Sequence, residues 1–355
     1  MASPFDILRA AHSGGSLRAA LGVTGTVSVW KDVGTMFRLL VSALIAVALC
    51  TVCARADETR ATPRIGVMPL ASPELEDSLR KGLRELGYIE GNNLLIEWSR
   101  SSTRGGQFSQ LAANLARANV DLIVASGSSA AQAALTGTTV PVVFAPVGDP
   151  VASGFVASLA KPGGRGTGVS TVTIEIMAKR LELLRAVAPH ARRVAYVMNS
   201  SNPIATPQLS EAQKTARALG VHLVTVDILS SADIDQIPRS VRTGSADAVL
   251  VSGDLLFLEH RSALVRAIRS TKLPAMFPLR QFHDYGVLMS YGTDLNDVMH
   301  RAARYVDKIL KGASPADLPI EQISQYELIV DLRVAHAMGI QVPRDVLLRA
   351  NQIIQ

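Results

Sequence analysis

The chain has 355 residues, of which 48% are apolar and 19% are charged, and 36 Lys and Arg against 30 Asp and Glu give a net charge of +6. An apolar fraction this high, without a charge-biased tract, excludes an intrinsically disordered chain. The length allows one large domain or two ordinary ones of roughly 100–200 residues each. Two cysteines exclude a disulfide scaffold, and since Lys and Arg do not cluster with aromatic residues, no nucleic-acid partner is expected.

The first 56 residues are predicted to be an N-terminal extension and a signal peptide. Arg38 precedes an uncharged run of sixteen residues, 39–54, shorter than the roughly 20 apolar residues of a membrane-spanning helix. Such a run behind a basic residue is typical of a signal peptide. Small side chains at Ala54 and Ala56 predict cleavage before Asp57, and an uncleaved anchor is the alternative. We therefore expect a periplasmic protein.

The segment before Met36 does not look like part of a signal peptide. Residues 1–35 are rich in Gly and Ser and lack clear periodicity. Either translation starts at Met36 or the segment is a disordered extension. A lipid anchor is not expected, because neither Cys50 nor Cys53 follows the small residue that a lipoprotein signal needs.

Apolar runs alternate with amphipathic segments in the first half of the mature chain. The periodicity predicts strands over 64–68, 94–98, 121–125 and 140–145, and helices over 73–87, 107–118 and 130–135. Buried strands separated by helices indicate βαβ units and a parallel sheet.

The pattern starts again after Gly168. Helices are predicted over 174–188, 207–219, 257–269 and 294–310, and strands over 193–198, 222–226, 248–251, 274–277 and 287–291. Asp121 and Asp247 each begin the pattern D-x-x-x-x-S-G, and each half later has a strand that starts at Pro and reaches Phe just before another Pro. The sequence therefore predicts an α/β protein with two similar Rossmann-like lobes and a ligand cleft between them.

The loop after strand 121–125 is the first candidate for ligand contact. Ser126, Ser128 and Ser129 stand between this buried strand and an Ala-rich helix. Their hydroxyls and the backbone N–H groups at a helix start could hold a carboxylate or another anion. Ordinary N-capping by Ser128 or Ser129 is the alternative.

Other strand ends supply the remaining candidates, which are Asp149, Asn199, Asp254 and Tyr291. Asp149 precedes Pro150, so capping of a helix is its main alternative role. Asp254 occupies the position of the second half that mirrors Ser128, and its carboxylate suits an amine or hydroxyl donor. Its alternative role is to cap the helix over 257–269.

Motifs of catalysis and metal binding are absent from the sequence. It contains no G-x-S-x-G, no H-E-x-x-H and no paired His or Cys with metal-ligand spacing. We expect no catalytic residue, no metal and no cofactor.

Several segments, taken in order and spacing, resemble the tryptophan- and tyrosine-type substrate-binding proteins of ABC transporters. The resemblance spans about 63–355 and rests on Glu85–Asn93, Asp149–Val151, Leu159–Gly164 with Thr167–Val169, Ser290–Thr293, Ile309–Gly312 with Pro315–Pro319, and Tyr326–Leu332.

This resemblance implies the type I periplasmic-binding-protein fold, in which three crossings form a hinge between two lobes. The expected lobes are 61–170 with 293–320, and 171–292 with 321–355. It also implies a monomer that binds a small molecule, delivers it to the permease subunits and does no chemistry. An exported enzyme or a ligand sensor with the same cleft is the alternative.

Two departures leave the ligand itself unassigned, although some members of the family bind aromatic amino acids. Members often have Thr-Pro-Ala-Ala where this chain has Ser128–Ala131. The segment Arg280–Asp284 also differs from the acidic loop of the amino-acid binders.

Overall fold

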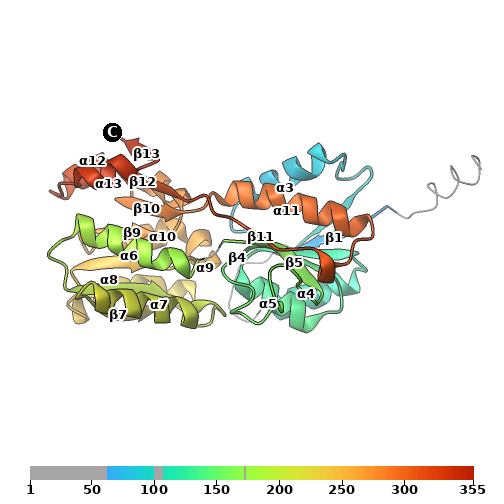
Figure 1. Ribbon diagram of the computed structural model, residues 1–355, viewed down its shortest axis with the longest axis horizontal. Coiled ribbons are helices and arrows are strands. Elements are labelled where there is room, and N and C mark those ends of the chain that lie inside the picture. Colours follow the sequence, from blue (N-terminus) through green and yellow to red (C-terminus); the bar gives the residue numbers. More distant parts are fainter. Residues whose placement is uncertain (1–61, 100–106, 172) are drawn as a thin grey trace, which may run out of the picture. The chain divides into compact units, whose positions relative to one another are not determined.

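A computed structural model describes residues 62–99, 107–171 and 173–355. This part of the chain contains two β-sheets with helices packed on them (Figure 1). The signal peptide and the cleavage site predicted from the sequence lie outside the described residues.

Each sheet collects strands that are far apart in the sequence. In spatial order, the first sheet contains β11 (Glu321–Gln322), β5 (Gly166–Ser170), β4 (Val142–Val147), β3 (Leu122–Ala125), β1 (Arg64–Val67) and β2 (Leu95–Trp98). The second contains β13 (Gln352–Ile354), β12 (Glu327–Asp331), β10 (Met289–Gly292), β9 (Ala275–Phe277), β8 (Ala248–Val251), β6 (Arg193–Met198) and β7 (His222–Asp227). The predicted α/β class with two parallel sheets is confirmed.

Helices cover both faces of the first sheet. On one face lie α3 (Pro73–Glu85) and α11 (Leu295–Leu310), and on the other α4 (Phe108–Arg117) and α5 (Ser128–Gly137). Strand β3 is apolar throughout because both of its faces are buried. Leu122 and Val124 join the core under α3 and α11, whereas Ile123 and Ala125 join the core under α4 and α5.

The second sheet is covered in the same way. One face carries α6 (Glu175–Val187), α7 (Ala205–Ala218), α12 (Leu332–Ala337) and α13 (Arg344–Arg349). The other carries α8 (Ile237–Thr243), α9 (Leu255–Glu259), α10 (Arg261–Arg269) and the short 3₁₀ helix η1 (Ser231–Gln236). Two further 3₁₀ turns are η2 (Arg280–Tyr285) and η3 (Pro315–Asp317).

The two sheets share one strand order. The series β2-β1-β3-β4-β5 in the first corresponds to β7-β6-β8-β9-β10 in the second. The sequence echo has a matching structural role at the start of the strands. Asp121 accepts the backbone N–H of Arg64 at 2.7 Å, and Asp247 accepts those of Arg192 and Arg193 at 2.8 and 2.9 Å. Each of these aspartates therefore ties the start of the third strand to the start of the first.

The chain passes between the sheets after β5, after β10 and after β11. Glu321 in β11 pairs with Val169 in β5, so the last passage begins in the first sheet. The exact lobe boundaries expected from the sequence stay a prediction.

The strands β5, β11, β12 and β13 and the helices α8, α12 and α13 were not assigned from the sequence. Of these, β12 runs antiparallel to β10, with Glu327 opposite Gly292. After β11 the chain returns to the second sheet at the carboxyl end of β10. Strand β12 starts at that end and therefore runs antiparallel to β10. The helix expected over 257–269 is two helices, because His260 has φ −99° and ψ 27° and interrupts the helical backbone between α9 and α10.

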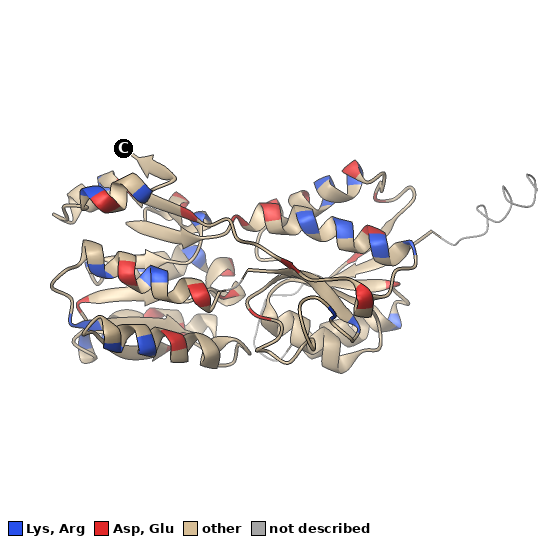
Figure 2. Ribbon diagram, in the orientation of Figure 1, with Lys and Arg blue, Asp and Glu red and all other residues tan. Residues whose placement is uncertain are grey.

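Charged residues lie mainly on the helices and loops, and the buried strands carry few of them (Figure 2). Within the described ranges, no helix combines the length and the apolar character needed to cross a bilayer.

Helices α3 and α11 approach each other closely at Gly82. A Cβ atom built on Gly82 would lie 2.5 Å from the carbonyl oxygen of His300 and 2.8 Å from Cβ of Ala303. We therefore expect Gly82→Ala to lower the free energy of unfolding by about 1–3 kcal/mol, the usual cost of overpacking. Urea denaturation measures this difference.

Gly137→Ala is the matched control, because a Cβ there meets no described atom within 4 Å. This variant should match the wild type or gain up to about 1 kcal/mol, since Ala restricts the unfolded chain. Equal stability of the Gly82→Ala variant and the wild type would contradict the close helix contact.

Candidate functional site

Loops that follow strands of both sheets enclose two adjoining cavities, of about 70 and 170 Å³. The carboxyl ends of parallel strands are the usual place for a ligand in such folds. Residues shared by the two linings are Gly127, Ser128, Asn202, Asp254 and Leu255. They come from the ends of β3, β6 and β8, so both sheets build one site.

The first sheet contributes the N-terminus of α5. Gly127 is the N-cap residue with φ 82°, and no described side chain caps this helix. Ser128 is buried, and its Oγ lies 3.5 Å from the backbone N–H of Gly148, which donates to it. The capping role considered for Ser128 and Ser129 is therefore not what the structure shows. The first N–H groups of the helix have no cap from a described side chain, and they carry the positive end of the helix dipole.

The second sheet contributes Asp254, at the start of α9. One carboxylate oxygen accepts the backbone N–H of Leu256 at 2.8 Å, which is the N-cap bond. The other accepts Nδ2 of Asn202 at 2.7 Å and Nδ2 of Asn199 at 3.3 Å. Burial raises the pKa of Asp254, while these donors act in the opposite direction. Asp254 thus caps a helix and lines the cavities at the same time.

A buried arginine is the second charged group of the site. Arg180 of α6 is 1% exposed and lines the smaller cavity. Its Nε donates to the carbonyl of Tyr291 at 2.7 Å, and its Nη2 donates to that of Pro278 at 3.1 Å. Its Nη1 is buried and has no hydrogen-bond partner among the described residues. Burial lowers the pKa of Arg180 to about 10, so the guanidinium stays charged at neutral pH.

The remaining lining combines apolar side chains with hydroxyls from the passages between the sheets. Thr171 and Thr293 are buried where the chain leaves β5 and β10, and both line the smaller cavity. Apolar side chains of the same cavity are Ile176, Ile204, Leu255, Leu258, Leu279 and Leu295. The site therefore offers opposite charges and hydroxyls within an apolar surround.

The structure brings together four of the residues predicted from the sequence. Ser128 and Asp254 line both cavities, and Ser129 and Asn199 line the larger one.

The other three predicted residues are not part of either lining. Ser126 is fully buried. Asp149 accepts the backbone N–H groups of Val151 and Ala152 at 3.0 and 2.9 Å within a turn, so the helix that it was expected to cap is not formed. The ring of Tyr291 packs on that of Tyr326, with centroids 5.8 Å apart.

Sequence reasoning missed Arg180, Asn202, Thr171 and Thr293 as lining residues. Arg180 had a visible signal, because it interrupts the buried face that Met177, Leu181 and Leu184 form on α6.

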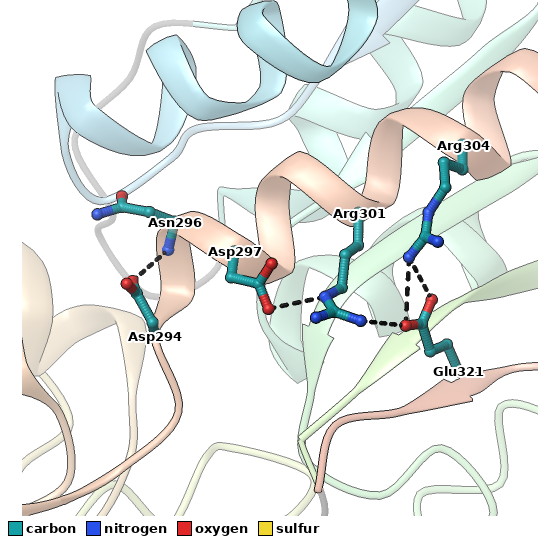
Figure 3. Close-up of polar contacts among 6 residues, drawn as sticks. All are labelled: Asp294, Asn296, Asp297, Arg301, Arg304 and Glu321. Carbon is teal, nitrogen blue, oxygen red and sulfur yellow. Dashed lines mark hydrogen bonds and ion pairs between the residues drawn. The ribbon is translucent and has the colours of Figure 1, made fainter. Parts of the chain in front are cut away.

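Ion pairs hold the passages beside the site. Asp294 caps α11 by accepting the N–H of Asn296 at 2.9 Å, and further along this helix Arg301 pairs with Asp297 and with Glu321 of β11, both at 2.7 Å. Arg304 also pairs with Glu321, at 2.9 Å (Figure 3). Helix α11 and β11, which flank two of the passages, are thereby fixed to each other.

A second pairing lies on the side of the second sheet. Arg280 of η2 lies 3.5 Å from Asp294 and 3.0 Å from Glu327, so it joins the segments that enter α11 and β12. In the described ranges, no three or more His, Cys, Asp or Glu residues form a group that could hold a metal ion.

Comparison with known proteins assigns this architecture to a family. Residues 71–354 match the family model described as ABC transporter substrate binding protein. The tyrosine-binding protein of Clostridioides difficile (strain R20291) is 25% identical over 320 residues, which cover 85% of this chain and 92% of that protein.

Solved structures of an ABC domain and of a substrate-binding protein are also similar to this chain. The ABC domain from Streptococcus pneumonia in complex with L-Trp has a TM-score of 0.75 and 27% identity, covering 83% of this chain and 100% of that chain. The ligand-free, open structure of a substrate-binding protein with adhesive properties from Clostridium difficile has a TM-score of 0.56 and 25% identity, covering 82% and 99%.

More distant structures establish the fold alone. They include the lac repressor and a glucose-galactose binding protein from Geobacillus stearothermophilus, with 15% and 12% identity. The fold is thus the type I periplasmic-binding-protein fold expected from the sequence. The chain belongs to the ABC transporter substrate-binding protein family, as an extracytoplasmic binding component of a transporter and not an enzyme.

Proposed function

We propose that this protein, as a monomer in the periplasm, binds an aromatic amino acid such as tyrosine or tryptophan between its lobes and delivers it to a permease. The observation that carries the proposal is a cavity with both a carboxylate, Asp254, and a helix N-terminus, that of α5, on an apolar surround. The amine of an amino acid would pair with Asp254, its carboxylate with the positive N-terminus of α5, and its side chain with the apolar residues of the cavity.

The relatives support this choice of ligand. One is named a tyrosine-binding protein, and another was solved with L-Trp. The aromatic ring would lie against leucine and isoleucine side chains, with Phe108 at the edge of the larger cavity. Asp254, Asn199, Ser128 and Ser129 are the proposed polar contacts.

Contacts across the cleft support a mechanism of lobe closure. A Cβ atom on Gly127, from the first sheet, would lie 2.7 Å from Cδ1 of Leu255, from the second. One on Gly148 would lie 3.0 Å from Cγ1 of Ile204 and would also clash with Oγ1 of Thr173. The TM-score is also higher with the L-Trp complex, at 0.75, than with the open, ligand-free relative, at 0.56.

Closure also fits the size of the site. Small-molecule sites usually measure roughly 300–1,000 Å³, more than the 70 and 170 Å³ of the two cavities. The lobes would therefore part for a ligand to enter. The ligand favours the closed state to the extent that it binds this state more tightly than the open one.

A ligand panel tests the proposed function. L-Tyrosine or L-tryptophan at 100 times its dissociation constant should raise the free energy of unfolding by about 2.7 kcal/mol. Urea denaturation with and without ligand measures the gain. Glucose and an alditol are the controls, because sugar binders share only the fold. Stabilisation by a sugar, and by neither amino acid, would refute the proposal.

Gly148→Ala tests lobe closure. The added methyl group should hold the lobes apart and weaken binding of the aromatic amino acid by about 5–150-fold, equivalent to overpacking by 1–3 kcal/mol. Calorimetry gives the affinity, and small-angle scattering should show less compaction on adding ligand.

Gly164→Ala is its control, since a Cβ there has no described atom within 4 Å. It should bind like the wild type. Unchanged affinity and compaction in Gly148→Ala would count against closure at this loop.

Export is tested by N-terminal sequencing of periplasmic material. Cleavage before Asp57 is expected, because Ala54 and Ala56 occupy the small-residue positions of the cleavage site. A retained N-terminus upstream of Cys50 would show that the leader stays as an anchor.

A further inference from the structure

The guanidinium of Arg180 has one nitrogen that the protein leaves unused. Nε and Nη2 donate to the carbonyl oxygens of Tyr291 and Pro278, whereas Nη1 is buried without a described partner. The side chain lines the smaller cavity. A buried donor that carries charge strongly favours a partner, because desolvation otherwise goes uncompensated.

No described carboxylate forms an ion pair with Arg180. Burial raises the pKa of the phenols of Tyr196, Tyr291 and Tyr326, which interact with the guanidinium, so these groups are neutral at neutral pH and supply no negative charge. The two carbonyl bonds satisfy donors but do not neutralise the charge. The positive charge of Arg180 therefore has no counter-ion among the described residues.

We propose that Nη1 of Arg180 binds the carboxylate of the ligand and makes the site selective for free acids over their amides and amines. The proposal rests on the proposed function, in which the ligand is an amino acid. A carboxylate fits better than a neutral acceptor, because a charge-assisted bond to a guanidinium is shorter and stronger.

The groups around Arg180 also favour a ligand carboxylate at this end of the cavity. The N-terminus of α5 lines the same cavity and is positive. Thr293 adds a hydroxyl donor two positions after the carbonyl of Tyr291, whereas the hydroxyl of Thr171 donates to the carbonyl of Val147 at 3.4 Å. Asp254 repels a carboxylate and attracts an amine. An amino acid is therefore oriented with its carboxylate toward Arg180.

Arg180 also has a structural role, which the test has to separate from ligand binding. Its bonds connect α6 to the end of β10 and to the loop after β9. Loss of these bonds lowers stability whatever the ligand, so stability alone does not decide the matter.

The first arm compares L-tyrosine with L-tyrosinamide, which keeps the ring and the amine but lacks the carboxylate charge. Calorimetry on the wild-type protein should show tyrosine binding about 10–100-fold more tightly. Arg180→Met should lose that preference, with little further loss for the amide. Lys179→Met is the control, because it removes a partly exposed cation from the same helix, one that pairs with Glu182 and lies outside both cavity linings, and it should keep the preference.

Two outcomes of this first arm overturn the proposal. One is equal affinity of the wild type for tyrosine and tyrosinamide, a result that needs no variant to fold. The other is an equal loss for both ligands in Arg180→Met, which indicates a structural role only.

The second arm separates this proposal from the proposed function and uses acetate as the probe. Sodium acetate, compared with sodium chloride at equal ionic strength, should raise the Tm of the wild type more than that of Arg180→Met. Equal effects on the two proteins overturn the carboxylate site. If acetate discriminates but no aromatic amino acid binds, the carboxylate site stands and the proposed ligand class fails.

Discussion

The bonds from Arg180 to two backbone carbonyls connect the parts of the molecule that form the site. They join α6 to the end of β10 through Tyr291 and to the loop after β9 through Pro278. Gly292 lies directly beside this junction, where a Cβ would clash with the carbonyl of Pro278 and lie 3.3 Å from Nη2 of Arg180. The passage into α11 begins here, so a buried charge fixes the point at which the chain leaves the second sheet.

The site as a whole follows from what parallel strands leave at their carboxyl ends. Each strand end delivers backbone N–H groups and a short polar loop, and these have to be satisfied by caps, by other loops or by a ligand. Asp254 satisfies the start of α9, whereas the start of α5 has no described side-chain cap. This asymmetry gives the site one negative and one positive wall, which is the polarity of an amino acid.

Hydrophobic patterning was sufficient to predict the class of fold, because strands such as β3 and β8 are buried on both faces and are therefore apolar throughout. It also located Ser128 and Asp254 as lining residues, since the loops after such strands face the cavities. It marked Arg180 only as a charged residue on the buried face of α6, because the carbonyl groups that bind this side chain come from distant segments of the chain. The direction of β12 was equally hidden, because it depends on where the chain re-enters the sheet.

The repeated strand order lets one half of the molecule serve as a reference for the other. Asp121 and Asp247 agree between the halves, and both have the same task at the start of the strands, far along the sheet from the cavities. Ser128 and Asp254 stand in corresponding loops and differ, and both line the cavities. The residues on which the halves agree therefore connect the strands of each lobe, and the residues on which they differ give the cavities their polarity. Comparing the two halves of this one chain thus gives information that usually comes from comparing two sequences.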